Sequence, residues 1–205
     1  MFANTGLVVG LVGLAAGGVI AGLVIWFVRM RLRVGAAWKA FAAKHGFEHM
    51  PSNVGAPLLR GDFRNVPVMI TTEWHSHGGE RVYYTAVTAW LGTQLPMMLM
   101  STERMDLLGG GPNETPLALK LPELKDYTIW SRDSAGAKAL LTGPVRTMLQ
   151  ALLSQYPLVL VQGDQVKVEI PEVLANVPDM ETMVDDVVRL TQLMSKALRA
   201  TAPRE

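Results

Sequence analysis

The chain has 205 residues, of which 49% are hydrophobic and 18% charged, and its 19 basic residues nearly balance its 18 acidic ones. This length suits one domain, or one domain with an appendage, and the lack of cysteine excludes disulfides, thiolate metal sites and cysteine nucleophiles. The even charge balance, without a basic stripe interleaved with aromatic residues, argues against nucleic acid as a partner. The charge is unevenly distributed, because residues 1–28 contain no ionisable side chain.

An apolar run at residues 7–28 predicts a transmembrane helix. At about 1.5 Å per residue, these roughly 22 positions span about 33 Å, enough to cross the hydrocarbon core of a bilayer. The run leads directly into Arg29, Arg31 and Arg33, so it is typical of an uncleaved anchor rather than of a signal peptide. Basic residues accumulate on the cytoplasmic flank of membrane helices. We therefore expect a single-pass protein of the bacterial inner membrane, with its N-terminus outside and its C-terminal domain cytoplasmic.

Glycines recur on two neighbouring faces of this predicted helix. Gly6, Gly10, Gly13 and Gly17 share one face, and Gly18 and Gly22 form a second small-xxx-small pair. Two helix backbones approach each other closely at such faces, which predicts self-association or packing against another membrane protein. The alternative is that these spacings arise by chance, because glycine is common in membrane helices.

Residues 34–45 have the spacing of a juxtamembrane amphipathic helix that ends at Gly46. Trp38, Phe41 and His45 lie at i, i+3 and i+7, on one face. This face either packs on the domain that follows or contacts anionic lipid headgroups. Packing is favoured, because Phe47 directly after a glycine cap is typical of a hydrophobic closure of a helix end.

The next segments predict an antiparallel meander with polar turns. The expected strands are residues 58–63, 66–74 and 82–91, with a fourth at 97–100. One face of the sheet should cover a core, with Val68 and Ile70 on it from the second strand and Tyr84, Ala86 and Thr88 from the third. Residues 106–125 are rich in glycine and proline and predict a long surface loop.

The second half of the chain predicts helices that cover this sheet. A strand at 127–131 precedes a helix at 135–155, which is broken near Pro144. A hairpin at 158–170 should direct Lys167 and Glu169 outward, and a final helix at 179–200 has a continuous apolar stripe. The predicted fold class is therefore α+β, a mainly antiparallel sheet covered by helices after one N-terminal transmembrane helix. The predicted divisions are 1–33 (anchor), 34–50 (juxtamembrane helix), 51–200 (cytoplasmic domain) and 201–205 (tail).

This order of elements resembles uncharacterised bacterial single-pass membrane-anchored proteins of the domain-of-unknown-function kind. The resemblance depends on the membrane helix, the Trp38-x-x-Phe41-Ala42 helix capped by Gly46, the Leu59-Arg60-Gly61 strand entry and the Asp126-Tyr127-Thr128-Ile129-Trp130 strand before a long helix. It covers most of the chain and implies the same architecture. It implies no catalytic residues.

The sharpest cluster of chemically active side chains is Glu73, His75 and His77. These three alternate along a predicted strand and so project from one face, and a carboxylate with two imidazoles suits zinc or iron. The competing interpretation is a solvated hairpin tip, because His-x-His lacks the spacing of recognised zinc motifs.

Motifs for a serine nucleophile, a Walker sequence or a dinucleotide site are absent from the sequence. We therefore expect no cofactor and favour a membrane-tethered non-enzymatic adaptor or subunit of an inner-membrane complex, with the lipid bilayer and another membrane helix as partners. The alternative hypothesis is a metal-dependent enzyme or metal sensor that uses Glu73, His75 and His77.

Overall fold

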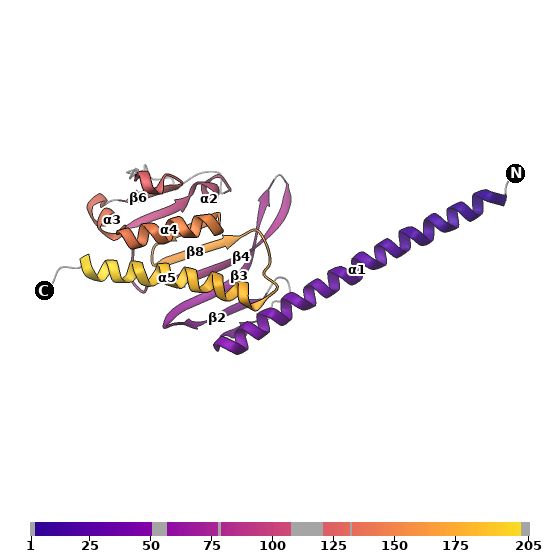
Figure 1. The fold of residues 1–205 in the computed structure, drawn as a ribbon, viewed down its shortest axis with the longest axis horizontal. Helices are drawn as coiled ribbons and strands as arrows, with labels where there is room; N and C mark the ends of the chain where they lie inside the picture. The colour runs from indigo at the N-terminus through magenta and orange to yellow at the C-terminus, as the bar shows by residue number, and fades with distance from the viewer. Residues whose placement is uncertain (1–2, 51–56, 78, 108–120, 132, 202–205) are drawn as a thin grey trace.

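The computed structural model of the chain describes residues 3–50, 57–77, 79–107, 121–131 and 133–201, without the side chains of residues 3–20, 77 and 123. It has one layer of sheet and one layer of helices, from which the long helix α1 projects as a rod (Figure 1). The α+β class and the mainly antiparallel sheet are thus confirmed.

Helix α1 spans Ala3–His45 without interruption, and its C-terminal part belongs to the hydrophobic core. Trp38 and Phe41 are both fully buried, which confirms that the amphipathic segment packs on the domain. Gly46 ends the helix at a φ of +71°, and the Phe47 N–H donates to the Ala42 carbonyl at 2.9 Å. This is the expected closure, because glycine adopts the left-handed conformation without a Cβ clash.

The described residues form an eight-stranded sheet in the order β1-β2-β3-β4-β8-β7-β5-β6, and every neighbouring pair is antiparallel. The strands are β1 Glu48–Met50, β2 Leu58–Phe63, β3 Val66–His77, β4 Glu80–Trp90, β5 Met97–Ser101, β6 Tyr127–Ser131, β7 Leu158–Gln162 and β8 Gln165–Ile170. The predicted meander is confirmed for β2, β3 and β4. Strand β5 lies apart from it, between β7 and β6.

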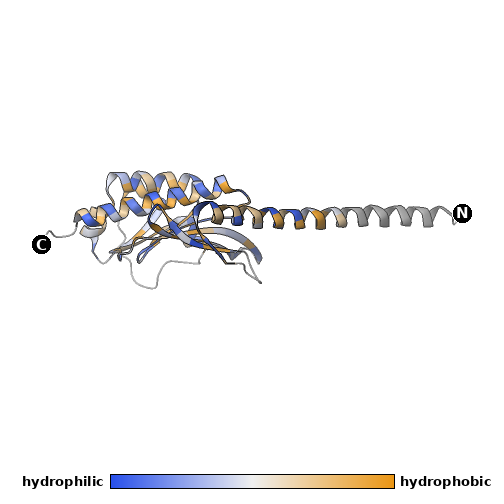
Figure 2. Cartoon of the chain, turned by 90° about the horizontal axis from the view of Figure 1, so that it is seen from below, coloured by the Kyte–Doolittle hydropathy of each residue, from blue (hydrophilic) through white to orange (hydrophobic). Residues whose placement is uncertain are grey.

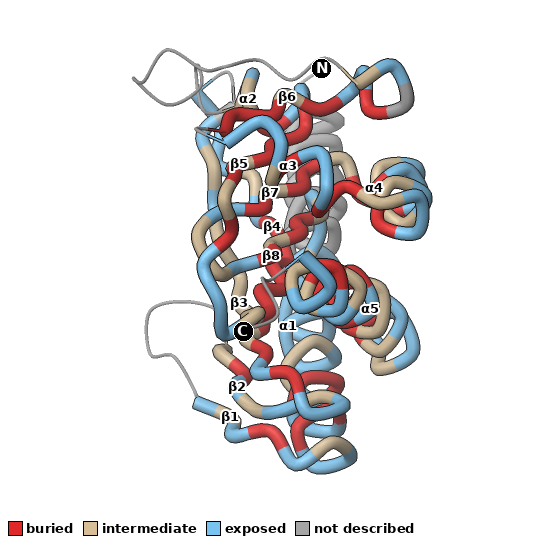
Figure 3. The backbone as a smooth tube through the Cα atoms, turned by 90° about the vertical axis from the view of Figure 1, so that its left-hand side faces the viewer, coloured by how far each residue is buried: buried red, intermediate tan, exposed pale blue. Residues whose placement is uncertain are grey.

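Three helices after the meander cover one face of the sheet. They are α3 Ser134–Leu140, α4 Gly143–Gln155 and α5 Val177–Thr201. Helix α2 Thr102–Leu107 lies on the other face, where its Arg104 reaches Glu169, and the short 3₁₀ helix η1 Pro122–Leu124 contacts α4. Figures 2 and 3 show α4 and α5 side by side over the same face, and in Figure 3 their buried residues lie toward the strands. The predicted break near Pro144 is confirmed. It separates α3 from α4, and Pro144 occupies the first turn of α4.

One predicted strand face is wrong. The core face of β4 carries Thr85, Val87 and Ala89, because Val87 pairs with Ile70 and Ala89 with Val68 on β3. Tyr84, Ala86 and Thr88, which were predicted to face the core, lie on the opposite face. Alternation gave no guide here, because β4 is central in the sheet and every residue from Tyr84 to Ala89 is buried, whichever face it occupies.

The exposed part of α1 contains large apolar side chains. Residues 21–33 are all exposed, and Trp26 and Leu32 have exposed fractions of 61% and 67%. Where side chains are described, from Ala21 onward, no helix combines the length and apolar character that a bilayer crossing requires. The predicted span at 7–28 lies mostly outside those residues, as do the predicted packing glycines Gly6, Gly10, Gly13, Gly17 and Gly18.

Several other predictions fall partly outside the described residues. The predicted loop at 106–125 includes the last two residues of α2 and the whole of η1, and residues 108–120 between them are not described. Gly22, the last of the predicted packing glycines, lies in the described part of α1, and a Cβ added there would meet no atom within 4 Å.

Candidate functional site: a buried ion-pair network on the sheet

Charged side chains from β3, β8 and α2 meet on the sheet face opposite α4 and α5. They are Glu73 and His75 of β3, Lys167 and Glu169 of β8, and Arg104 of α2. Strand β4 lies between β3 and β8 and presents the small side chain of Ala86 directly beside Glu169 in the register. The long charged side chains therefore reach one another across β4.

Glu169 is the centre of this network, and its side chain is fully buried. Its Oε1 accepts hydrogen bonds from Arg104 Nη1 and from Lys167 Nζ, the latter at 2.9 Å. Burial alone would raise the pKa of Glu169, but the charges of Arg104 and Lys167 and their hydrogen bonds outweigh it and lower that pKa below its ordinary value of 4.5. Glu169 is therefore an ionised carboxylate inside the protein.

His75 binds the other oxygen of the same carboxylate. Its Nε2 lies 2.7 Å from Glu169 Oε2, so the hydrogen is on Nε2 and is donated to the carboxylate. The imidazole also packs edge-on against Tyr84, with ring centroids 4.8 Å apart. Burial, then the negative charges of Glu169 and Glu103, raise the pKa of Tyr84, which keeps this phenol protonated.

Lys167 bridges the two carboxylates of the network. Its Nζ lies 2.7 Å from each oxygen of Glu73 while it also contacts Glu169. Two carboxylates therefore face two basic side chains, Lys167 and Arg104. Such a network is stable in a low dielectric because each charge has a partner.

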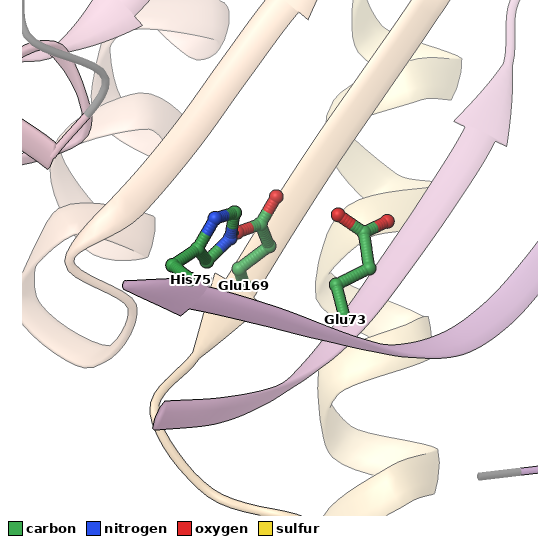
Figure 4. A group of neighbouring side chains, drawn as sticks. All are labelled: Glu73, His75 and Glu169. Carbon is green, nitrogen blue, oxygen red and sulfur yellow. The ribbon is translucent and has the colours of Figure 1, made fainter. Parts of the chain in front are cut away.

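The predicted metal ligands are brought together only in part. The possible ligand atoms of Glu73, His75 and Glu169 all lie within 4.8 Å of one another (Figure 4). The side chain of His77 lies outside the described residues, and Glu169 takes the third position. A cation bound by both carboxylates would compete with the Lys167 ammonium for the same oxygens, so the geometry favours the ion pairs over a metal ion.

The sequence did not identify the two residues that most define this site. Glu169 was expected to point outward to solvent, which is wrong, because Arg104 folds over it. Arg104 itself lies between the predicted strand at 97–100 and the predicted loop at 106–125, and no motif marks it. An indirect signal was available, since two charged residues alternating within β8 at the centre of a sheet need partners on their own face.

Comparisons with known proteins add a fold relationship. The sequence matches no known protein family and no curated protein. A crystal structure of the mycobacterial trehalose monomycolate transport factor A, TtfA, is similar, with a TM-score of 0.53 and 15% sequence identity over 84% of this chain and 98% of that chain. At this identity the similarity concerns the fold alone.

Proposed function

We propose that this chain is a membrane-tethered, non-enzymatic adaptor or subunit of an inner-membrane complex. One observation carries the proposal: α1 is continuous from the core of the domain to an exposed apolar segment. Trp38 and Phe41 fix one part of the helix inside the domain, while the side chains of residues 23–28 are about half exposed or more, with no contact from the domain to cover them. Apolar side chains exposed on all sides of a helix suit a lipid environment or the packing of another membrane helix.

The charged residues next to this segment support an orientation with the N-terminus outside and the domain in the cytoplasm. Arg29, Arg31 and Arg33 follow the apolar residues and are exposed, as expected for side chains at an anionic headgroup layer. Tethering confines the domain to the membrane surface and raises its effective concentration toward neighbours there, so modest contacts suffice for binding.

The fold relationship supports an accessory role only in general terms. The similar crystal structure is described as a transport factor, and a transport-related subunit is compatible with a tethered domain of this kind. The molecule transported in that system is a property of that protein and is not carried over.

Crosslinking in native membranes tests the proposal. Gly13→Ile and Gly17→Ile should weaken a specific oligomer or heterocomplex of the full chain, because a large side chain separates the two helix backbones. Ala15→Ile, on the opposite face of the same helix, is the matched control. A chain that is extracted by alkaline carbonate, or a monomeric pattern that neither variant changes, would contradict the proposal.

The alternative is a metal-dependent enzyme or metal sensor, and the convergence of Glu73, His75 and Glu169 is the observation that favours it. Metal analysis of the purified full chain decides between the two, with His75→Ala and Glu169→Gln as variants. We expect no stoichiometric metal, because Lys167 and Arg104 already pair with the two carboxylates. One equivalent of zinc that is lost in both variants would establish the alternative.

A further inference from the structure

An aromatic and cationic cluster lies near the tip of the β3–β4 hairpin. It consists of Trp74, Arg81 and Tyr83 and is called here the hairpin cluster. Trp74 and Tyr83 are direct cross-strand partners with exposed fractions of 53% and 52%, and the Arg81 guanidinium lies 4.8 Å from the centre of the Trp74 ring. Side chains with an apolar body and a polar tip are enriched where proteins meet the headgroup layer of a membrane.

The second observation is that the hairpin cluster lies beside α1. A hollow of about 610 Å³ is bounded by Met30 of α1, by residues 81–83 of the hairpin and by residues 171–176. The hairpin therefore lies beside α1 at Met30, between Arg29 and Arg31, where the exposed apolar segment gives way to basic residues. Figure 1 shows the same hairpin extending beyond α4 and α5 on the side from which α1 projects.

We infer that the hairpin cluster rests in the headgroup layer of an anionic bilayer, as a second membrane contact beside α1. The inference rests on the proposed function, since it requires α1 to be anchored. A bilayer surface that crosses α1 near Arg29–Arg33 also meets the hairpin. The aromatic rings then lie at the level of the glycerol and headgroups, and Arg81 pairs with lipid phosphate.

The charges around this surface favour anionic lipid. Arg81 joins the three arginines of α1. The acidic residues that share the region are Glu80, Glu172 and Asp179, so four arginines face three carboxylates and the surface remains positive. Each basic side chain near an anionic membrane contributes to binding, whereas a neutral lipid surface would gain only from the aromatic rings.

A second contact has a mechanical consequence. One helix through a bilayer leaves the domain free to rotate about the helix axis, whereas a helix and a hairpin together fix which face of the domain looks along the membrane. The surfaces available to a neighbouring membrane protein are then defined.

The absence of cysteine from the chain allows a direct test with single labels. Ser76→Cys places a fluorophore on an exposed residue of β3 beside the hairpin cluster, and Val24→Cys places one on exposed α1. Gln162→Cys places one at the opposite end of the sheet, because Gln162 pairs with Gln165, the partner of Trp90 at the far end of β4. Each full-length variant is reconstituted into phosphatidylcholine vesicles with or without phosphatidylglycerol, and quenching by headgroup-region spin-labelled lipid is measured.

We expect quenching at Val24 and at Ser76 in anionic vesicles, and none at Gln162. Arg81→Gln should lower the ratio of docked to undocked hairpin about fivefold, and Trp74→Ala with Tyr83→Ala should abolish quenching at Ser76. Lys39→Gln, which removes an exposed cation from the part of α1 docked on the domain, is the matched charge control and should change nothing.

The outcomes separate this inference from the proposed function. Quenching at Val24 without quenching at Ser76 would overturn the hairpin contact and leave the anchor in place. Quenching at neither position would overturn both. Equal quenching at Ser76 in neutral vesicles, unaffected by Arg81→Gln, would overturn the assignment of anionic lipid.

Discussion

Arg104 and Glu169 form the most deeply buried ion pair among the described residues, with exposed side-chain fractions of 6% and 0%. Arg104→Met leaves an ionised carboxylate with one cation fewer, and removing one partner of a buried pair costs about 3–5 kcal/mol. We expect a loss of that size in the free energy of unfolding, measured by denaturant titration of the full chain in detergent. Arg189→Met, which removes an exposed i, i+4 pair with Asp185, is the control and should cost less than about 0.5 kcal/mol. Equal losses in the two variants would contradict a structural role for the network.

The lowered pKa of Glu169 makes this contribution dependent on pH. Because the folded pKa lies below the ordinary value of 4.5, the unfolded chain binds a proton first as the pH falls. The stabilisation is therefore complete above about pH 4.5 and is lost as the pH falls through the folded pKa. We expect Glu169→Gln to flatten this acid limb in a series of unfolding curves. Glu48→Gln, which removes an exposed carboxylate from edge strand β1, should leave it steep.

Elements with local signals were predictable from the sequence. The predicted strands at 58–63 and 66–74 leave Arg64 and Asn65 for the turn between β2 and β3, and both residues adopt positive φ, at +51° and +63°, as a tight hairpin turn requires. The β7–β8 hairpin and the helix break before Pro144 depended in the same way on a few adjacent residues. Spacing by two also placed Glu73 and His75 on one face correctly, since alternation in a strand is a local property.

Features that depend on distant segments were not predictable. Glu169 is buried because Arg104, 65 residues earlier, folds over it, and neither residue signals this in its own neighbourhood. The place of β5 between β7 and β6 likewise follows from pairing with strands far along the chain. Hydrophobic alternation specifies which residues share a face, but it does not specify what covers that face.

Helix α1 is docked on the domain through Trp38. Trp38 is fully buried, and its indole Nε1 donates to the Leu174 carbonyl at 2.9 Å. Trp38→Ala removes this bond and leaves a cavity, which should cost about 3–5 kcal/mol. We expect amide hydrogen exchange of residues 34–45 to accelerate, whereas Lys39→Ala, at an exposed neighbour, should leave it unchanged. Slow exchange in Trp38→Ala would indicate that other contacts hold the helix.

The long helix α1 and the domain form one continuous body. Helix α1 has 43 residues, so at about 1.5 Å per residue it is roughly 65 Å long. Its hydropathy changes along this length, from the apolar exposed segment through the arginines to the amphipathic part that joins the core (Figure 2). With the proposed anchoring, the position of the domain relative to a bilayer follows from how far along α1 the membrane surface lies.

The charge distribution along α1 predicts how this body is oriented across the membrane. Arg29, Arg31 and Arg33 follow the apolar segment, and none of the side chains of residues 1–28 is ionisable, so the positive-inside tendency predicts that the domain is on the cytoplasmic side. The cysteine-free chain allows single labels at both ends of the molecule. In spheroplasts, an impermeant maleimide should label Asn4→Cys at once and should label Gln162→Cys only after lysis. The parent chain, without cysteine, reports background labelling. Labelling of Gln162→Cys in intact spheroplasts, with Asn4→Cys protected, would reverse the orientation and place both the hairpin cluster and the partner surfaces on the outer side.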